Sequence, residues 1–155
     1  MAHKGGMIDI STKDVTIRTA KACGYICLNE EAFQTVKKGA CIKGDVLSTV
    51  KIAAINAVKS TSAIIPMCHP ILIEAIDVDF VLNEPDRTIR ITVTVKSSGK
   101  TGVEMEALVG VTVACLTIYD MLKYIDKAMT ISRVELVEKT GGKSGDYKRC
   151  ETLQR

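Results

Sequence analysis

GKTGVEMEALVGVTVACLTIYDMLKYID, residues 99–126, is the stretch around which we expect the chain to fold. Its middle, residues 107–119, holds 13 residues without a charge. An amphipathic surface helix would carry polar residues on every turn, so this pattern predicts a helix that is buried on more than one side. The uncharged run is too short to span a bilayer, which takes about 20 apolar residues. We therefore expect a central helix that packs on a sheet and against a second partner, in a protein that does not enter the membrane.

Shorter elements are predicted on both sides of this helix. Apolar alternation and β-branched runs predict strands over residues 15–28, 72–82, 88–96 and 130–137. Helical spacing predicts one helix that begins after Asn29 and ends at Gly39, and a second helix that begins after Asp45. The segment that follows contains Pro66 and Pro70 and cannot continue a helix.

The order of these elements is strand, two helices, two strands, helix and strand. This is the ferredoxin-like pattern with one extra helix. We expect an α+β fold in which an antiparallel sheet is covered by helices on one face. At 155 residues a single domain, residues 1–155, is the default. Its polar ends, residues 1–13 and 148–155, are expected to be flexible.

The composition argues against several classes of function. The net charge of +3 is too small for a dedicated nucleic-acid-binding protein, which carries a strongly basic patch. The six cysteines form no CxxC pair and the chain has two histidines, so no metal site is predicted. The start of the chain lacks the apolar run of a secretory signal. We expect a cytoplasmic protein with reduced thiols.

Asp120 and Lys123 lie three residues apart on the central helix and therefore share a face. An exposed ion pair is the ordinary explanation for such spacing. The pair follows the uncharged middle of the helix, however, and this predicts partial burial. Burial would move both pKa values toward neutrality, as acid/base catalysis requires.

Two further acids, Glu104 and Glu106, begin the same helix. Glu106 and Asp120 differ by about 40° around the helix axis and by about 21 Å along it. One helix cannot bring them to one small-molecule site, but two antiparallel copies related by a twofold axis can. We therefore predict a dimer whose active sites combine residues of both chains. The alternative is that the two acids only complement the helix dipole.

Two glycine-rich loops, Gly99-Lys100-Thr101 and Gly142-Lys143-Ser144, look like the end of a P-loop. Neither has the first glycine of GxxxxGK[ST], because Thr94 and Val137 occupy those positions. Both loops are candidates for phosphate contacts through backbone N–H groups and lysines, or are simply solvated. His69, held between two prolines, is a further candidate, although a lone histidine is more often structural.

Five motifs follow one another along the chain. They are Lys43-Gly44-Asp45, Ile65-Pro66-Met67-Cys68-His69-Pro70, GKTGVEMEA from Gly99 to Ala107, Thr117-Ile118-Tyr119-Asp120-Met121 with Lys123, and GGKSG from Gly141 to Gly145. In this order they resemble the MoaC family of molybdenum cofactor biosynthesis, the cyclic pyranopterin monophosphate synthases. Each motif alone is weakly specific, whereas five in register over residues 8–148 are highly specific.

The resemblance implies a lyase that acts on a GTP-derived substrate. Members of the family convert (8S)-3′,8-cyclo-7,8-dihydroguanosine 5′-triphosphate to cyclic pyranopterin monophosphate and release diphosphate. No cofactor is implied, although a divalent ion could accompany the triphosphate. The resemblance further implies a ferredoxin-like protomer in a homohexamer, a trimer of dimers, with active sites at the dimer interface.

The resemblance also implies roles for individual residues. Asp120 and Lys123 match the catalytic acid/base pair of the family. The residues that match substrate-binding positions are Met67, Cys68, His69, Glu104, Met105, Glu106, Lys43, Lys139 and Arg18, and Lys143 joins them as a phosphate contact. Met67 stands where leucine is frequent in the family, a change that nearly conserves volume.

The residues alone leave two alternatives to this function open. A ferredoxin-like oligomer that binds a phosphorylated ligand without chemistry would keep the basic loops but would not need Asp120 with Lys123. A P-loop nucleotidase is disfavoured, since both glycine-rich loops lack the required first glycine.

Overall fold

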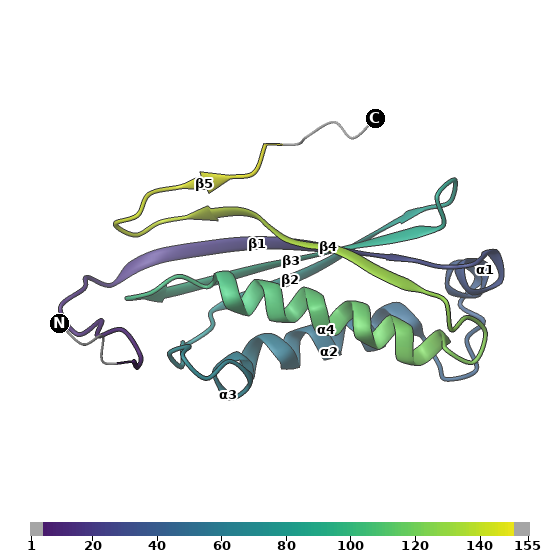
Figure 1. Cartoon of the computed structure of the whole chain (residues 1–155), viewed down its shortest axis with the longest axis horizontal. Helices are drawn as coiled ribbons and strands as arrows, with labels where there is room; N and C mark the ends of the chain where they lie inside the picture. The colour runs from purple at the N-terminus through teal and green to yellow at the C-terminus, as the bar shows by residue number, and fades with distance from the viewer. Residues whose placement is uncertain (1–4, 151–155) are drawn as a thin grey trace.

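A five-stranded antiparallel sheet forms one layer of the computed structural model, which describes residues 5–150 (Figure 1). The strands are β1 (Thr16–Cys27), β2 (Ala75–Asn83), β3 (Thr88–Gly99), β4 (Thr130–Thr140) and β5 (Tyr147–Lys148). Their order in the sheet is β2-β3-β1-β4-β5, so β1 lies between the strands that flank the longest helix in sequence. This order confirms the predicted ferredoxin-like α+β fold.

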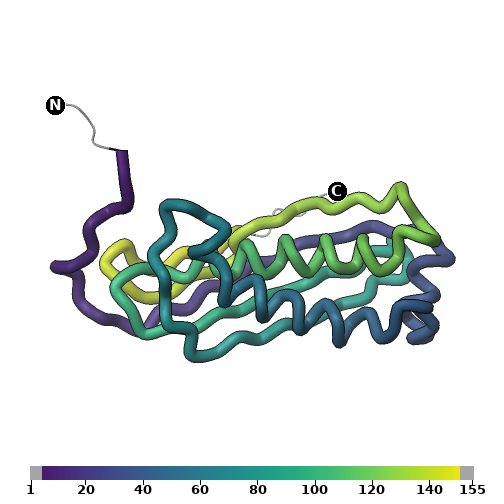
Figure 2. The backbone as a smooth tube through the Cα atoms, turned by 90° about the horizontal axis from the view of Figure 1, so that it is seen from below, coloured from purple at the N-terminus to yellow at the C-terminus, as the bar shows by residue number. Residues whose placement is uncertain are grey.

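Four helices complete the protomer: α1 (Glu30–Lys38), α2 (Val46–Lys59), α3 (Thr61–Ile64) and α4 (Glu104–Leu122). The long helices α2 and α4 lie side by side on one face of the sheet (Figures 1 and 2). The side chain of Asn29 caps α1 through the N–H of Ala32, and Gly39 ends it with a φ of 64°. Asp45 caps α2 in the same way, accepting from the N–H of Ser48 at 2.6 Å.

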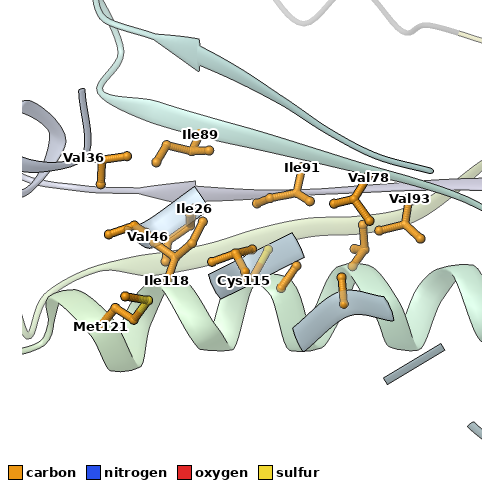
Figure 3. Close-up of a cluster of buried hydrophobic side chains, with 14 of the residues drawn as sticks. Ile26, Val36, Val46, Val78, Ile89, Ile91, Val93, Cys115, Ile118 and Met121 are labelled. Atoms are coloured by element: carbon orange, nitrogen blue, oxygen red, sulfur yellow. The ribbon is translucent and has the colours of Figure 1, made fainter. Parts of the chain in front are cut away.

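The core fills the space between the sheet and the two long helices. Ile91 and Val93 of β3 and Cys115 and Ile118 of α4 are fully buried there (Figure 3). Burial raises the pKa of Cys115 to about 12, so this thiol acts as a packing group. The predicted packing role of Cys115 and the predicted burial of the central helix on the sheet are confirmed.

The helix α4 is long and apolar enough, by length and composition, to cross a membrane. Half of its 18-residue apolar window is buried within the protein, against the sheet and α2. A core helix of a globular domain passes the same test of length and composition, and the packing of α4 identifies it as such a helix.

Several predicted boundaries differ from the structure. β2 begins at Ala75 rather than at residue 72, while β3 and β4 continue to Gly99 and Thr140. The helix α3 and the strand β5 were not predicted, because each is too short to show a period.

The predicted flexible ends lie partly outside the described residues. Residues 1–4 and 151–155 of these ends are not among the residues that the structure describes. Residues 5–14 form neither helix nor strand, although Lys100 Nζ donates to the carbonyl of Ser11 at 2.6 Å. At the other end, Lys148 pairs with Glu138, and Arg149 N–H donates to the carbonyl of Val137 at 2.8 Å. Residues 148 and 149 are therefore ordered against β4 rather than free.

Candidate active site

A cavity of about 300 Å³ opens at the N-terminal end of α4. The first turn of α4 and the segment after α3 line it together, although they lie far apart in sequence. It contains all six residues of the two predicted substrate-binding segments: Met67, Cys68, His69, Glu104, Met105 and Glu106. The tertiary fold therefore brings these two segments to one place.

Glu106 is the least exposed acid of this cavity, with 3% of its surface accessible. Burial raises the pKa of Glu106, and the neighbouring carboxylate of Glu104 acts in the same direction. Burial also raises the pKa of the Cys68 thiol, with a further contribution from Glu106. Burial therefore favours the neutral forms of Glu106 and Cys68 more than water does.

A basic group adjoins this cavity. Lys139 Nζ lies 3.5 Å from a carboxylate oxygen of Glu104 and donates to Ser144 Oγ at 2.6 Å. Arg18 Nε donates to the carbonyl of Gly99 at 2.9 Å, which holds the guanidinium at the base of the GKTG loop. Lys139 thus links β4 to the first residue of α4, and Arg18 links β1 to the loop that precedes α4.

The glycine-rich loop after β4 closes over Arg18. Gly141 and Gly142 have φ values of 87° and 83°, and a Cβ on Gly142 would clash with the Arg18 guanidinium. An open cavity of about 800 Å³ lies beside this contact, lined by Thr12, Lys13, Asp14, Thr16, Arg18, Lys143 and Ser144. Predicted phosphate-binding residues therefore surround one solvent-filled space.

We refer to Met67–His69, Glu104–Glu106, Arg18, Lys139 and Lys143 as the N-terminal cluster of α4. It gathers nine of the predicted site residues around two neighbouring cavities. Lys13, which was not predicted as a site residue, lines both cavities and so connects them.

The remaining predicted residues lie at the other end of the helix. Asp120 binds Lys123 Nζ at 2.7 Å and Lys43 Nζ at 3.1 Å, and its carbonyl accepts from Lys43 Nζ at 2.7 Å. We refer to Lys43, Asp120 and Lys123 as the C-terminal cluster of α4. Lys43 was predicted only as a basic active-site position, and the structure adds that it bridges to the acid of the pair.

The pair Asp120–Lys123 is exposed in the protomer, with 59% and 53% of the two side chains accessible. Hydrogen bonds from Lys123 and Lys43 lower the pKa of Asp120, and the hydrogen bond to Asp120 raises the pKa of Lys123. The prediction that burial moves both pKa values toward neutrality is therefore wrong for the single protomer, because each ion stabilises the charge of the other.

The two clusters do not meet within one chain. Glu106 and Asp120 stand about 21 Å apart along α4 at 1.5 Å per residue, as the uninterrupted helix Glu104–Leu122 requires. The chain thus holds two separated clusters: a cavity with a buried acid beside basic loops, and an exposed carboxylate held between two ammonium groups.

Residues 7–142 match the family described as MoaC. This chain belongs to the MoaC family. Proteins named cyclic pyranopterin monophosphate synthase share about half of its residues. One from Heliobacterium modesticaldum is 51% identical over 151 residues, which covers 96% of this chain and 95% of the relative. Those from Helicobacter hepaticus and Campylobacter jejuni are 52% and 49% identical over 143 residues, covering 92% of this chain.

Some residues of the MoaC cavities escaped the sequence analysis. Ile8, Ile10 and Lys13 line the cavity at the N-terminal end of α4, although they belong to a segment predicted to be loose. The available signal was the alternation of Ile8 and Ile10 within an otherwise polar stretch.

No metal centre is apparent in the part of this MoaC chain that the structure describes. Within residues 5–150, no three side chains of His, Cys, Asp or Glu are grouped closely enough to hold a metal ion.

Proposed function

We propose that this chain is a cyclic pyranopterin monophosphate synthase that converts (8S)-3′,8-cyclo-7,8-dihydroguanosine 5′-triphosphate to cyclic pyranopterin monophosphate and diphosphate. The observation that carries the proposal is the pairing of a cavity and basic loops at one end of α4 with the Lys43–Asp120–Lys123 cluster at the other. Relatives about half identical over nearly the whole chain, each named for this synthase, support it.

The N-terminal cluster would bind the substrate. Its cationic side chains, Arg18, Lys139 and Lys143, suit the triphosphate and the charge that grows as diphosphate leaves. The cavity lined by Met67, Cys68 and His69 suits the heterocycle, because its walls are apolar with a few polar groups. A divalent ion, if present, would arrive with the triphosphate as part of the substrate.

The C-terminal cluster would move protons. Opening a purine-derived ring and closing a pyranopterin require repeated proton transfers, and a carboxylate with adjacent ammonium groups can accept and donate them. In the protomer Asp120 is ionised and Lys123 is protonated, so Asp120 begins as the base and Lys123 as the acid. The buried carboxyl of Glu106, whose pKa burial raises, is a second candidate for proton transfer in the opposite cluster.

Both clusters would meet in a dimer. An antiparallel copy of α4 would place the partner's C-terminal cluster against the N-terminal cluster of this chain. The outer surface of α4 favours such packing, because Met105 and Leu116 lie about 20° apart around the axis and are 37% and 53% exposed. The neighbouring helix α2 adds Ile52, which is 61% exposed. The full assembly would be a cytoplasmic homohexamer, a trimer of such dimers.

The first experiment assays the purified protein with the cyclo-dihydro-GTP substrate and measures the pterin product. Asp120→Asn and Lys123→Ala should abolish turnover while the protein still folds and binds substrate. Asp77→Asn, on the helix-free face of β2, is the matched control and should stay active. Near-normal product formation by either cluster variant would contradict the acid/base assignment. Diphosphate release from ordinary GTP would favour a nucleotidase, and binding without turnover would favour a ligand-binding oligomer.

The second experiment tests the composite site. An inactive Glu106→Ala protein is mixed with an inactive Asp120→Asn protein under conditions of subunit exchange. With random pairing, half of the dimers are mixed and each mixed dimer has one intact site, so about a quarter of the wild-type activity should return. Absence of any recovery after demonstrated exchange would contradict the two-chain site.

A further inference from the structure

The helix-free face of the sheet carries a polar pocket far in sequence from both clusters. Ile89 and Ile91 of β3 belong to the buried cluster under the helices (Figure 3). Side chains alternate across a strand, so Arg90 faces the opposite side of the sheet. There Arg90 pairs in register with Tyr25 of β1 and Val81 of β2, and Tyr25 pairs with Ser132 of β4. A single row of residues thus crosses four strands.

Two guanidinium groups flank the ring of Tyr25 in this row. The Cζ atom of Arg133 lies 4.9 Å from the ring centroid and that of Arg90 lies 5.9 Å from it. Such cation–π contacts orient the planar guanidinium and leave its edge free to donate. An open cavity of about 490 Å³ lies over the row, lined also by Asn83, Asp86 and Thr88.

Arg90 is incompletely satisfied by the described chain. Its Nε is closed to solvent and has no hydrogen-bond partner within residues 5–150. None of the carboxylates in that part of the chain lies within 4.0 Å of Arg90, whereas Arg133 binds Glu135 at 3.3 Å. The guanidinium has five N–H donors, so the donors other than the enclosed Nε are the ones that Arg90 can offer to a ligand in the cavity.

The backbone turns Arg133 toward the pocket. The pairing of β1 with β4 shifts between Cys23 and Tyr25, which leaves Arg133 in a bulge opposite Gly24. Arg133 adopts a φ of 49°, a left-handed conformation that is unfavourable for a residue with a side chain. Bulges redirect side chains in this way. The bulge sends Val134 toward Gly24 on the helix side and leaves Arg133 on the other face with Tyr25.

We propose that this Tyr25–Arg90–Arg133 pocket binds a phosphate group, either free or as part of a nucleotide. Among the lining residues the two arginines outweigh the single carboxylate of Asp86, and Asp86 is engaged by Asn83 at 2.8 Å. The two guanidinium edges provide charge-assisted donors matched to phosphate oxygens, and the neutral phenol of Tyr25 adds a hydroxyl. None of the residues that line the cavities at the N-terminal end of α4 also lines this pocket.

The test follows Tyr25 directly. The full-length protein is labelled with ¹³C-tyrosine, the Tyr25 resonance is assigned with Tyr25→Phe, and inorganic phosphate, diphosphate and GTP are titrated separately at constant ionic strength in chloride. A saturable shift of the Tyr25 resonance is expected. Saturation by inorganic phosphate identifies a site for the free anion, whereas saturation by GTP alone identifies a nucleotide site.

Variants establish which group binds. Arg90→Gln should weaken the titration at least about tenfold, the effect of losing a charge-assisted hydrogen bond. Arg90→Lys keeps the charge but loses the guanidinium edge and should weaken binding less. Arg87→Gln, in the β2–β3 turn and outside the pocket lining, is the control and should bind normally. A Tyr25 resonance that stays unmoved by all three ligands, or moves equally in Arg90→Gln, would overturn the proposal.

Discussion

Gly110 lies where α4 crosses α2, and it tests how closely the two helices must approach. A Cβ added at Gly110 would lie 2.7 Å from Val58 Cγ2 and 3.2 Å from Val93 Cγ1. Carbon atoms in contact prefer about 3.5–4.0 Å. Gly110→Ala therefore forces Val58 or the whole helix to move by roughly 1 Å, and overpacking of this kind costs about 1–3 kcal/mol.

The same substitution has a favourable term, because alanine is better than glycine inside a helix by about 1 kcal/mol. The balance is a net destabilisation of about 1 kcal/mol, which should lower the Tm by roughly 2–4 °C for a chain of this length. Urea unfolding of the wild type and the variant measures this difference in the free energy of unfolding. Equal protein concentrations are required, because dissociation of any oligomer also contributes to the measured stability.

Two further variants make the Gly110 prediction decisive. Gly99→Ala is the control, since the nearest atom to its new Cβ is Ser97 Oγ at 3.6 Å, and its stability should not change measurably. Adding Val58→Ala to Gly110→Ala removes the clashing methyl group, so the two changes should compensate by about 1 kcal/mol in a double-mutant cycle. A Gly110→Ala protein as stable as the wild type would refute the steric argument.

Three other predictions concern the site. Lys43→Ala removes a donor that lowers the pKa of Asp120, so the acid limb of the pH–activity profile should move to higher pH; an unmoved limb would exclude Asp120 as the base. Burial raises the pKa of Glu106 in the folded protein above its ordinary value of 4.5. The contribution of Glu106 to the stability of the fold is therefore present below pH 4.5 and is lost as the pH rises through the folded pKa. Glu106→Gln should therefore gain stability relative to wild type as pH rises, in urea titrations at several pH values, and a constant difference would contradict this. Tyr124 Oη accepts from the N–H of Ile42, the neighbour of Lys43, at 3.3 Å. Tyr124→Phe should therefore lower kcat with little change in KM. A rise in KM as large as the fall in kcat would argue against a positioning role.

Much of the fold was predictable because the local signals agree with one another. Asn29 and Gly39 cap and end α1 as their residue types predict, and most of the uncharged middle of α4 is buried or half-buried as expected, with Leu116 exposed. The ends of the strands were less predictable, since pairing partners decide where a strand stops. β3 reaches Gly99 because β1 pairs with it as far as Thr16.

The candidate site was likewise only partly predictable from the sequence. The sequence placed Glu106 about 21 Å and Glu104 about 24 Å from Asp120, because a helix has a fixed rise and α4 is unbroken. It did not predict that Lys43 would bridge to Asp120, since that contact joins residues 77 positions apart. Nor could it predict the ionisation of the pair, because pKa values depend on neighbours and on burial in three dimensions.

The sequence by itself determined the family, the order of elements and the identity of the acids and bases. These depend on residue types and on short-range periodicity. Only the tertiary structure decided that Met67 and Glu106 share one cavity, that Asp120 is exposed and ionised, and that Arg90 and Arg133 flank Tyr25. Each of these depends on strand register and helix packing, which join residues distant along the chain.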